Sequence, residues 1–302
     1  MDIKLSPIIT ASDGKKEQID QNAELHGILQ NINATMEIRN TIAEGGQGIL
    51  SSAADLPLNR LVAVKSLKKE FVHNSEQRSR FIAEAKVTAQ LDHPSIVPIY
   101  TLTTDEENGL HLAMKKLQGL TLQEYLEQVS RCYSMDGVRS YDEQKSIRYR
   151  LDLFLRICDA IAYAHSRNVL HCDLKPENIM IGEYHEAYVM DWGIAHPIRN
   201  AEYNPENWVR PKMISGTPRV LAPEVIAGDL PDERADVFAL GLILFEIVTL
   251  QPAFSGKDNE TLMAKILDGK MAEVKHLYRI KIDTDLEAVI HKACATDRRK
   301  RY

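Results

Sequence analysis

The stretch from His171 to Gly193, HCDLKPENIMIGEYHEAYVMDWG, constrains the fold of this chain more than any other part of it. Two short apolar runs, NIMI and YVM, lie on either side of Gly182. Such runs around a glycine predict two short strands joined by a turn. Because Asn178 and Asp191 stand at the outer ends of these runs, the hairpin would bring both side chains to the same edge.

The polar residues of this stretch form the combined pattern HxDxKPxNxx followed by DxG. A single H-x-D triplet often arises by chance, and Asp173, Lys175 and Asn178 could merely cap a helix. The combined string is much more specific. It resembles the catalytic loop and the metal-binding motif of protein kinases, and YVMDWGIA is especially similar to the bacterial Hanks-type (eukaryotic-like) serine/threonine kinases.

The resemblance implies a role for each polar residue. Phosphoryl transfer passes through a loose, negatively charged transition state, so the protein mainly supplies positioning and countercharge. Asp173 would accept the proton of the substrate hydroxyl, and Lys175 would lie beside the γ-phosphate of ATP. Asn178 and Asp191 would hold Mg²⁺, with Mn²⁺ as a second possible ion. Lys175 together with Thr217 resembles the serine/threonine class, whose substrates are hydroxyls of proteins.

A glycine cluster lies between two β-type runs after Met36, and a predicted strand follows over Leu61–Leu67. Glycines let backbone N–H groups approach phosphates closely. EGGQG alone would more often be an ordinary turn, but the lysine of VAVK, Lys65, supports a phosphate-binding loop. The match to the kinase pattern is partial, because Ala43 stands where the first glycine is expected. The resemblance implies nucleotide contacts at Ala43, Glu44, Gly45, Gly46, Gln47, Gly48, Leu50, Ala63, Lys65, Met114, Lys115, Leu117 and Met180.

The run SEQRSRFIAEAKVTAQL has apolar residues at helical spacing after the capping pair Asn74-Ser75. Glu84 falls on this helix, where a glutamate is usually solvated. By resemblance it pairs with Lys65 and fixes that lysine for phosphate contact, so that both belong to the catalytic set. DHPSIVPIY and Leu110–Leu117 follow as strands. An apolar Met114 is more often plain core, but the resemblance places it behind the adenine, with residues 115–117 as the hinge.

The segment from Asp191 to Glu224 contains three prolines in its middle and no periodicity. A loop of this length is usually functional or disordered. It resembles the kinase activation segment and closes with GTPRVLAPE. There Thr217 would touch Asp173 and Lys175.

Three further positions match the family pattern or depart from it. Asp236 would hold the backbone of the catalytic loop, and Arg301 would pair with Glu224 in a buried ion pair. Cys172 replaces the arginine usual in HRD, which in other members meets a phosphate on the activation segment. The sequence leaves open whether Cys172 marks a different regulation or is a small packing residue. Cations that could substitute for the arginine are Arg156, Arg167 and Arg210.

Composition and charge exclude several classes. The 302 residues are 44% hydrophobic and 26% charged, and the formal net charge of −6 argues against nucleic-acid or anionic-membrane binding. The 4 cysteines form no CxxC pair, which predicts reduced thiols in a cytoplasmic protein. VFALGLILFEIVTL is too short for a membrane span and carries Glu246, so a buried helix is expected. A membrane anchor could still follow Tyr302. The oligomeric state is not indicated.

The organisation predicted is α+β and two-lobed. Residues 1–35 would form an extension with a short helix over Glu17–Leu29, and residues 36–302 the kinase domain. Within it, an antiparallel sheet with one helix (about 36–116) would lie over a mainly helical lobe (about 117–302), with ATP between them. A helix over Thr121 to about Gln128, a polar insertion at 130–146 and a helix over Arg148–Arg167 are expected. The last helix of the family is missing, so a fragment is expected.

Three functions compete. The first is an active serine/threonine protein kinase, the second a catalytically weak kinase fold that acts as a binding module, and the third a small-molecule kinase with the same ATP lobe. The third has no use for GTPRVLAPE, which resembles a peptide-docking segment. All the polar residues expected to work are present, which favours the first over the second: Lys65, Glu84, Asp173, Lys175, Asn178 and Asp191.

Overall fold

The computed structural model describes residues 35–46, 48–107, 109–136, 143–197 and 217–302. The strands are β1 (Met36–Glu44), β2 (Gly48–Asp55), β3 (Arg60–Leu67), β4 (Ile99–Thr104), β5 (Leu110–Lys115), β6 (Gly119–Thr121), β7 (Val169–Leu170), β8 (Ile179–Gly182), β9 (Ala187–Val189) and β10 (His196–Pro197). The helices are α2 (Ser75–Thr88), α3 (Leu122–Asp136), α4 (Ile147–Ser166), α5 (Pro223–Ile226), α6 (Glu233–Thr249), α7 (Asn259–Leu267) and α8 (Thr284–Ala293).

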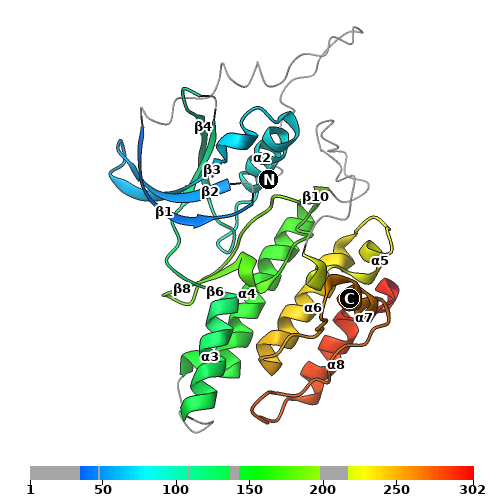
Figure 1. The fold of residues 1–302 in the computed structure, drawn as a ribbon. Coiled ribbons are helices and arrows are strands. Elements are labelled where there is room, and N and C mark those ends of the chain that lie inside the picture. Colours follow the sequence, from blue (N-terminus) through cyan, green and yellow to red (C-terminus); the bar gives the residue numbers. More distant parts are fainter. Residues whose placement is uncertain (1–34, 47, 108, 137–142, 198–216) are drawn as a thin grey trace, which may run out of the picture.

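The N-terminal lobe is an antiparallel sheet covered by one helix (Figure 1). Its strands lie in the order β1-β2-β3-β5-β4. The helix α2 begins where the Asn74 side chain accepts a hydrogen bond from the Gln77 backbone at 3.1 Å, as the capping pair predicted. Phe81 and Ile82 of α2 then pack on Leu110 and other buried residues of the sheet. Burial of this apolar face holds the helix, and therefore Glu84, against the sheet.

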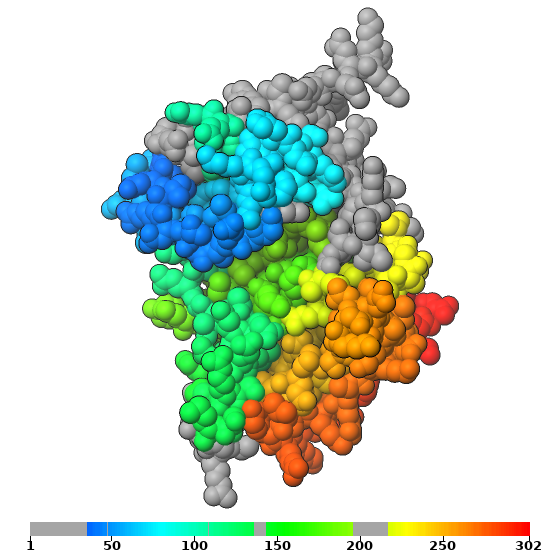
Figure 2. Space-filling view, viewed as in Figure 1, coloured from blue at the N-terminus to red at the C-terminus, as the bar shows by residue number. Residues whose placement is uncertain are grey.

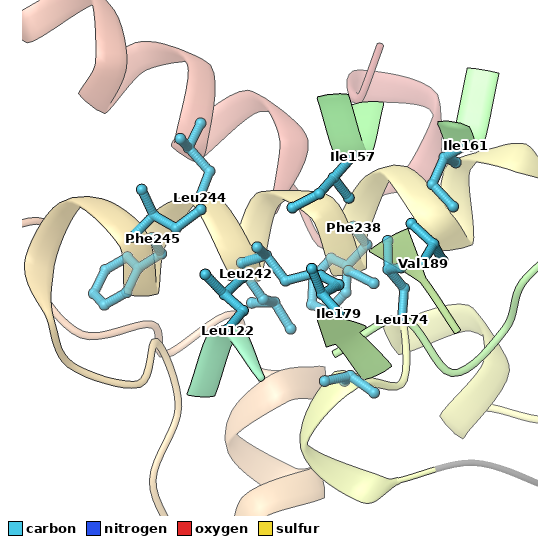
Figure 3. Packing of buried hydrophobic residues seen from close by; sticks show 14 of the residues in the cluster. Leu122, Ile157, Ile161, Leu174, Ile179, Val189, Phe238, Leu242, Leu244 and Phe245 are labelled. Carbon is cyan, nitrogen blue, oxygen red and sulfur yellow. The ribbon is translucent and has the colours of Figure 1, made fainter. Parts of the chain in front are cut away.

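The C-terminal lobe is mainly helical and is built around α6. This helix is almost entirely buried, as its apolar run predicted, and it packs between α4 and α8. Figure 3 shows the core where α3, α4, α6 and the β8–β9 hairpin meet. The same buried cluster includes Val87, Leu91 and Ile96 from the N-terminal lobe. The two lobes thus share one apolar core behind the site, and Figure 2 shows them in contact.

The hairpin predicted around Gly182 is confirmed. Strands β8 and β9 pair antiparallel, with Ile179 opposite Val189 and Met180 opposite Tyr188. The backbone N–H of Met190 donates to the carbonyl of Asn178 at 2.8 Å, so pairing continues to the outer ends of both strands. This register brings the residues before β8 and after β9 to one edge, which is where Asn178 and Asp191 are needed.

Three expectations about secondary structure need correction or fall outside the described residues. The helix expected over Thr121–Gln128 runs from Leu122 to Asp136, so the first part of the supposed 130–146 insertion is helical. Its polar residues have tertiary partners: the Ser130 hydroxyl lies 2.9 Å from that of Tyr278. In DHPSIVPIY only the end is strand, since β4 starts at Ile99. The helix expected over Glu17–Leu29 lies outside the described residues. Among the described helices, none has the length and hydropathy of a membrane span.

Candidate active site

The centre of the candidate site is the carboxylate of Asp173. One carboxylate oxygen accepts hydrogen bonds from the Lys175 ammonium at 2.7 Å and the Asn178 amide at 3.2 Å. The other accepts from the backbone N–H of Thr217 at 2.9 Å. The Lys175 ammonium also donates to the Thr217 hydroxyl at 2.5 Å, so the predicted contact of Thr217 with Asp173 and Lys175 is confirmed. A serine or threonine side chain can therefore lie beside this carboxylate and this cation.

The loop that carries Asp173 is fixed by Asp236 at the start of α6. Its carboxylate, 2% exposed, accepts from the backbone N–H groups of His171 and Cys172, each at 2.9 Å, and from the His165 ring at 2.8 Å. The role predicted for Asp236 is confirmed. Burial alone would raise the pKa of Asp236, but the hydrogen bonds and charges of the histidines lower it. Cys172 has a φ of 65°, a costly conformation for a residue with a Cβ. The two bonds to Asp236 support this turn.

His171 connects the same loop to the strand end that precedes Asp191. Its Nε2 lies 3.1 Å from the Met190 carbonyl, and its Nδ1 accepts from the Asp173 backbone N–H at 3.2 Å. The ring also packs on that of Trp192, with centroids 4.6 Å apart. Sequence reasoning gave His171 no role. Its place at the head of the HxD pattern was the signal for a structural one.

Lys65 on β3 and Glu84 on α2 form the predicted ion pair, with Nζ 2.5 Å from Oε1. Asp191 lies near the same lysine, its Oδ1 3.6 Å from Nζ. Burial disfavours the charged form of Lys65, but the carboxylates of Glu84 and Asp191 outweigh it and raise the pKa of Lys65. Burial likewise disfavours the charged form of Asp191, but Lys65 and His171 lower the pKa of its carboxyl group. The lysine is thus a fixed cation.

The residue types of the site fit a magnesium ion that is also bound by phosphates. No cluster of three or more His, Cys, Asp or Glu side chains within the described ranges could hold a metal by itself. Mg²⁺ commonly takes one or two protein ligands and completes its shell with water and substrate phosphates. The Asn178 amide nitrogen is used by Asp173, with donation to its carbonyl at 2.9 Å, which leaves the amide oxygen for a cation. The Asp191 side chain is 51% exposed and can supply a carboxylate.

The glycine-rich turn lies between β1 and β2, opposite Lys65. A Cβ on Gly48 would come within 3.0 Å of the Ser66 carbonyl, so glycine favours the close packing of this residue against β3. A Cβ on Gly46 would meet nothing, which leaves open space beside the turn. Ala43, where the pattern expects glycine, pairs with Leu50 directly after a register shift between Thr41 and Ala43.

Glu44, the last residue of β1, forms an ion pair with Lys68 at 2.8 Å, in which the lysine side chain is 21% exposed and the glutamate 61%. The Glu44 carboxylate therefore contacts Lys68, although Glu44 was expected to contact the nucleotide. Gln47 lies outside the described residues.

The residues expected around the adenine lie on β3, β5 and β8. Ala63 and Met114 are directly opposite each other on neighbouring strands, and Ala63 is buried. Met180 pairs with Tyr188 in the hairpin below. Leu117 follows β5, in the connection to the C-terminal lobe. The structure thus places these residues where the two lobes meet. Lys115 differs, because its side chain bonds to Tyr188.

The end of the activation segment is anchored by the predicted ion pair of Glu224 and Arg301. Both carboxylate oxygens of Glu224 accept from the guanidinium at 2.8 Å, and the side chains are 7% and 0% exposed. This prediction is confirmed. A second pair was not foreseen: Arg219 lies 2.5 Å from Glu177.

The thiol of Cys172 has a pKa raised by burial and by nearby Asp236 and Asp173, so it stays protonated. It is therefore not a reactive thiolate. Of the cations considered as substitutes for the missing arginine, Arg167 lies over the Tyr163 ring, 5.3 Å from its centroid. Arg210 lies outside the described residues.

Fold and site together define a kinase, and the chain belongs to the protein kinase family. The family model described as protein kinase domain matches residues 36–302. The chain is a serine/threonine protein kinase domain of the bacterial Hanks type.

Three relatives of the chain carry the same name. The chain is 32% identical over 280 residues to the serine/threonine-protein kinase PknD of Chlamydia felis, covering 88% of this chain and 29% of that protein. It is 32% identical over 281 residues to PknD of Chlamydia pneumoniae, with the same two shares of 88% and 29%. It is 34% identical over 230 residues to PknD of Protochlamydia amoebophila, covering 72% of this chain and 23% of that protein. The chain thus spans less than a third of the length of these relatives.

Proposed function

We propose that this domain transfers the γ-phosphate of Mg-ATP to serine or threonine hydroxyls of protein substrates, with Asp173 as the residue that acts on the hydroxyl. The observation that carries this is the set of bonds from Lys175, Asn178 and Thr217 to one carboxylate. A carboxylate held by donors on both oxygens is fixed in position, which is the main requirement for phosphoryl transfer.

The other residues divide between the nucleotide and the metal. Mg-ATP supplies the phosphoryl group and a cation that neutralises developing charge. Lys65, held by Glu84, binds phosphate oxygens, and Asn178 with Asp191 binds the metal ion. Mn²⁺ has the same preference for oxygen ligands and could replace Mg²⁺.

The adenine lies against Ala63, Met114 and Met180 in this proposal, with the hinge at residues 115–117. The open side of the turn, at Gly46, would face the phosphates, because the N–H of Gly45 already donates to the Gly48 carbonyl at 2.9 Å. Gly48 fits this role because its lack of a Cβ allows the close approach to β3 described above.

For the whole chain, we propose a catalytic unit over residues 36–302 whose lobes divide near residue 116, with residues 1–35 as an extension. The partners are protein substrates and ATP, without nucleic acid or membrane contact in this segment, because the formal net charge of −6 opposes binding to polyanions. A cytoplasmic location agrees with the 4 cysteines, none of them disulfide-bonded in the structure.

The test is transfer of labelled phosphate from ATP to a generic basic protein and to the domain itself, for the native sequence and for Asp173→Asn. We expect a rate loss of about 10²–10⁴-fold in the variant with nearly unchanged nucleotide affinity, because Asp173 acts on the hydroxyl and not on ATP. Lys65→Met should instead weaken nucleotide binding as well. Undiminished turnover in Asp173→Asn would refute the assignment.

A further inference from the structure

The hinge strand of the N-terminal lobe is tied to the C-terminal lobe by a side-chain hydrogen bond that no part of the proposed chemistry requires. The ammonium of Lys115, the last residue of β5, donates to the hydroxyl of Tyr188 on β9 at 2.6 Å. The same ammonium lies 4.7 Å from the centroid of the tyrosine ring. The two residues are 73 positions apart in the chain.

The environment makes this bond strong. Tyr188 is 7% exposed, so its hydroxyl is largely shielded from water. The hydrogen bond to Tyr188 is the main cause that raises the pKa of Lys115, against the opposing effect of burial. A hydrogen bond from a charged donor is roughly twice as strong as one between neutral groups. Lys115 therefore stays charged, as a charge-assisted bond to Tyr188 requires.

Strand β9 is also the place where the N-terminal lobe makes backbone contact with the C-terminal lobe. The N–H of Val189 donates to the carbonyl of Ser95 at 2.8 Å, and Val189 forms a parallel bridge with Ile96. The N–H of Lys115 in turn donates to the carbonyl of Pro98 at 3.0 Å. The segment 95–98 and the end of β5 thus form one unit that is fixed to β9 by its backbone and by the Lys115 side chain.

The position of Tyr188 links this junction to the site. It lies opposite Met180, which faces the adenine in the proposed site, and its strand β9 ends two residues before Asp191. A shift of β5 relative to β9 would change the distance between the hinge and the metal-binding carboxylate. A fixed distance between the two is what a nucleotide bound at both ends needs.

We propose that Tyr188 is a positioning residue for the nucleotide. Through its bond to Lys115 it holds the hinge at a fixed position relative to the strand that leads to Asp191. The proposal rests on the proposed function of the site. It concerns binding of Mg-ATP and not the transfer step, because the hydrogen bonds to the Asp173 carboxylate come from Lys175, Asn178 and Thr217.

The experiment compares Tyr188→Phe, which removes only the hydroxyl, with Tyr184→Phe as a matched control. Tyr184 lies in the turn of the same hairpin and is 85% exposed. We expect KM for ATP to rise about three- to tenfold in Tyr188→Phe with kcat within about twofold, the effect of one lost charge-assisted bond. The control should leave both constants unchanged. If Tyr188 had a purely structural role, Tyr188→Phe would lower the urea midpoint of unfolding without raising KM selectively over kcat.

A double-mutant cycle with Lys115→Met tests the pair itself. If the bond is the cause, Tyr188→Phe should raise KM for ATP little further in the Lys115→Met background. Equal effects of Tyr188→Phe in both backgrounds, or an unchanged KM in the single variant, would overturn the proposal. The affinity of each variant for a fluorescent ATP analogue is measured in parallel, because it tests the role of Tyr188 in nucleotide binding without depending on phosphate transfer. If the native domain transfers no phosphate but still binds the analogue more tightly than Tyr188→Phe does, the result counts against the proposed kinase activity and not against the role of Tyr188.

Discussion

Removal of either partner of the buried pair Glu224–Arg301 should destabilise the domain, and the two removals should differ in size. Arg301 has other acceptors: its guanidinium also donates to the carbonyls of Ala295 at 2.7 Å and Arg234 at 2.8 Å. The described side chains offer Glu224 no second cation within ion-pair distance. The carboxylate is therefore the group that a single substitution strands.

The loss of unfolding free energy in each variant depends on which charged group the substitution leaves unpaired. Arg301→Met leaves a 7% exposed carboxylate without its cation, which should cost about 3–5 kcal/mol of unfolding free energy. Glu224→Gln leaves an arginine that keeps its backbone acceptors and one amide oxygen, so about 1–3 kcal/mol is expected. The double variant should lose less than the sum, because neither charge is then left unpaired by the other's removal.

Urea unfolding of the domain measures these free energies, with Arg298→Met as the matched control. Arg298 belongs to the same short basic run, but its nearest carboxylates lie at 3.7 Å and 4.0 Å and its side chain is 35% exposed. An exposed pair of this kind contributes less than about 1 kcal/mol. If Arg301→Met costs no more than Arg298→Met, or if Glu224→Gln proves the more damaging single change, the reasoning about the stranded carboxylate is wrong.

Three further predictions concern pH and regulation. Burial, with a smaller effect of Arg150, lowers the pKa of His276 to about 4. The free energy of unfolding should therefore fall by about 1–3 kcal/mol as pH drops from about 6.5 to about 4, and His276→Gln should lack this pH dependence. Burial raises the pKa of Glu246 to about 7, so stability should fall as pH rises from about 4.5 to about 7, and Glu246→Gln should be the more stable form at pH 8 by about 1–3 kcal/mol. Because Cys172 cannot pair with a phosphate, full dephosphorylation should change the initial rate less than about twofold; a collapse that a phosphate in the 191–224 segment reverses would show that another cation has taken over.

Much of the fold could be predicted because its signals are local. The strands around Gly182, the cap at Asn74 and the apolar run of α6 each depend on residues adjacent in the chain. The length of α3 could not be predicted in this way. The hydroxyl of Ser130, just beyond the predicted end of this helix, has its partner in Tyr278, 148 positions away, and no local pattern marks such a pairing.

The candidate site likewise contains contacts that the sequence predicts and contacts that it does not. Lys65 with Glu84, and Glu224 with Arg301, could be paired only because a family pattern supplies the distant partner. The bond from Lys115 to Tyr188 has no counterpart in the motifs of the sequence, since a lysine on a strand end and a tyrosine on another strand are common surface residues. Only the packing of the two lobes, which brings the end of β5 beside β9, reveals their contact.

The missing arginine at position 172 has a physical consequence that follows from the contacts of its backbone. The N–H groups of His171 and Cys172 are both fixed by Asp236, and the imidazole of His171 bonds to the strand end at Met190. None of these bonds uses the side chain of residue 172. The position of Asp173 is therefore set by α6 and β9, which belong to the packed core, and not by a charge on the activation segment. A loop held in this way needs no phosphate to become ordered, whereas the segment 191–224 would still need its own anchors at Thr217 and Glu224.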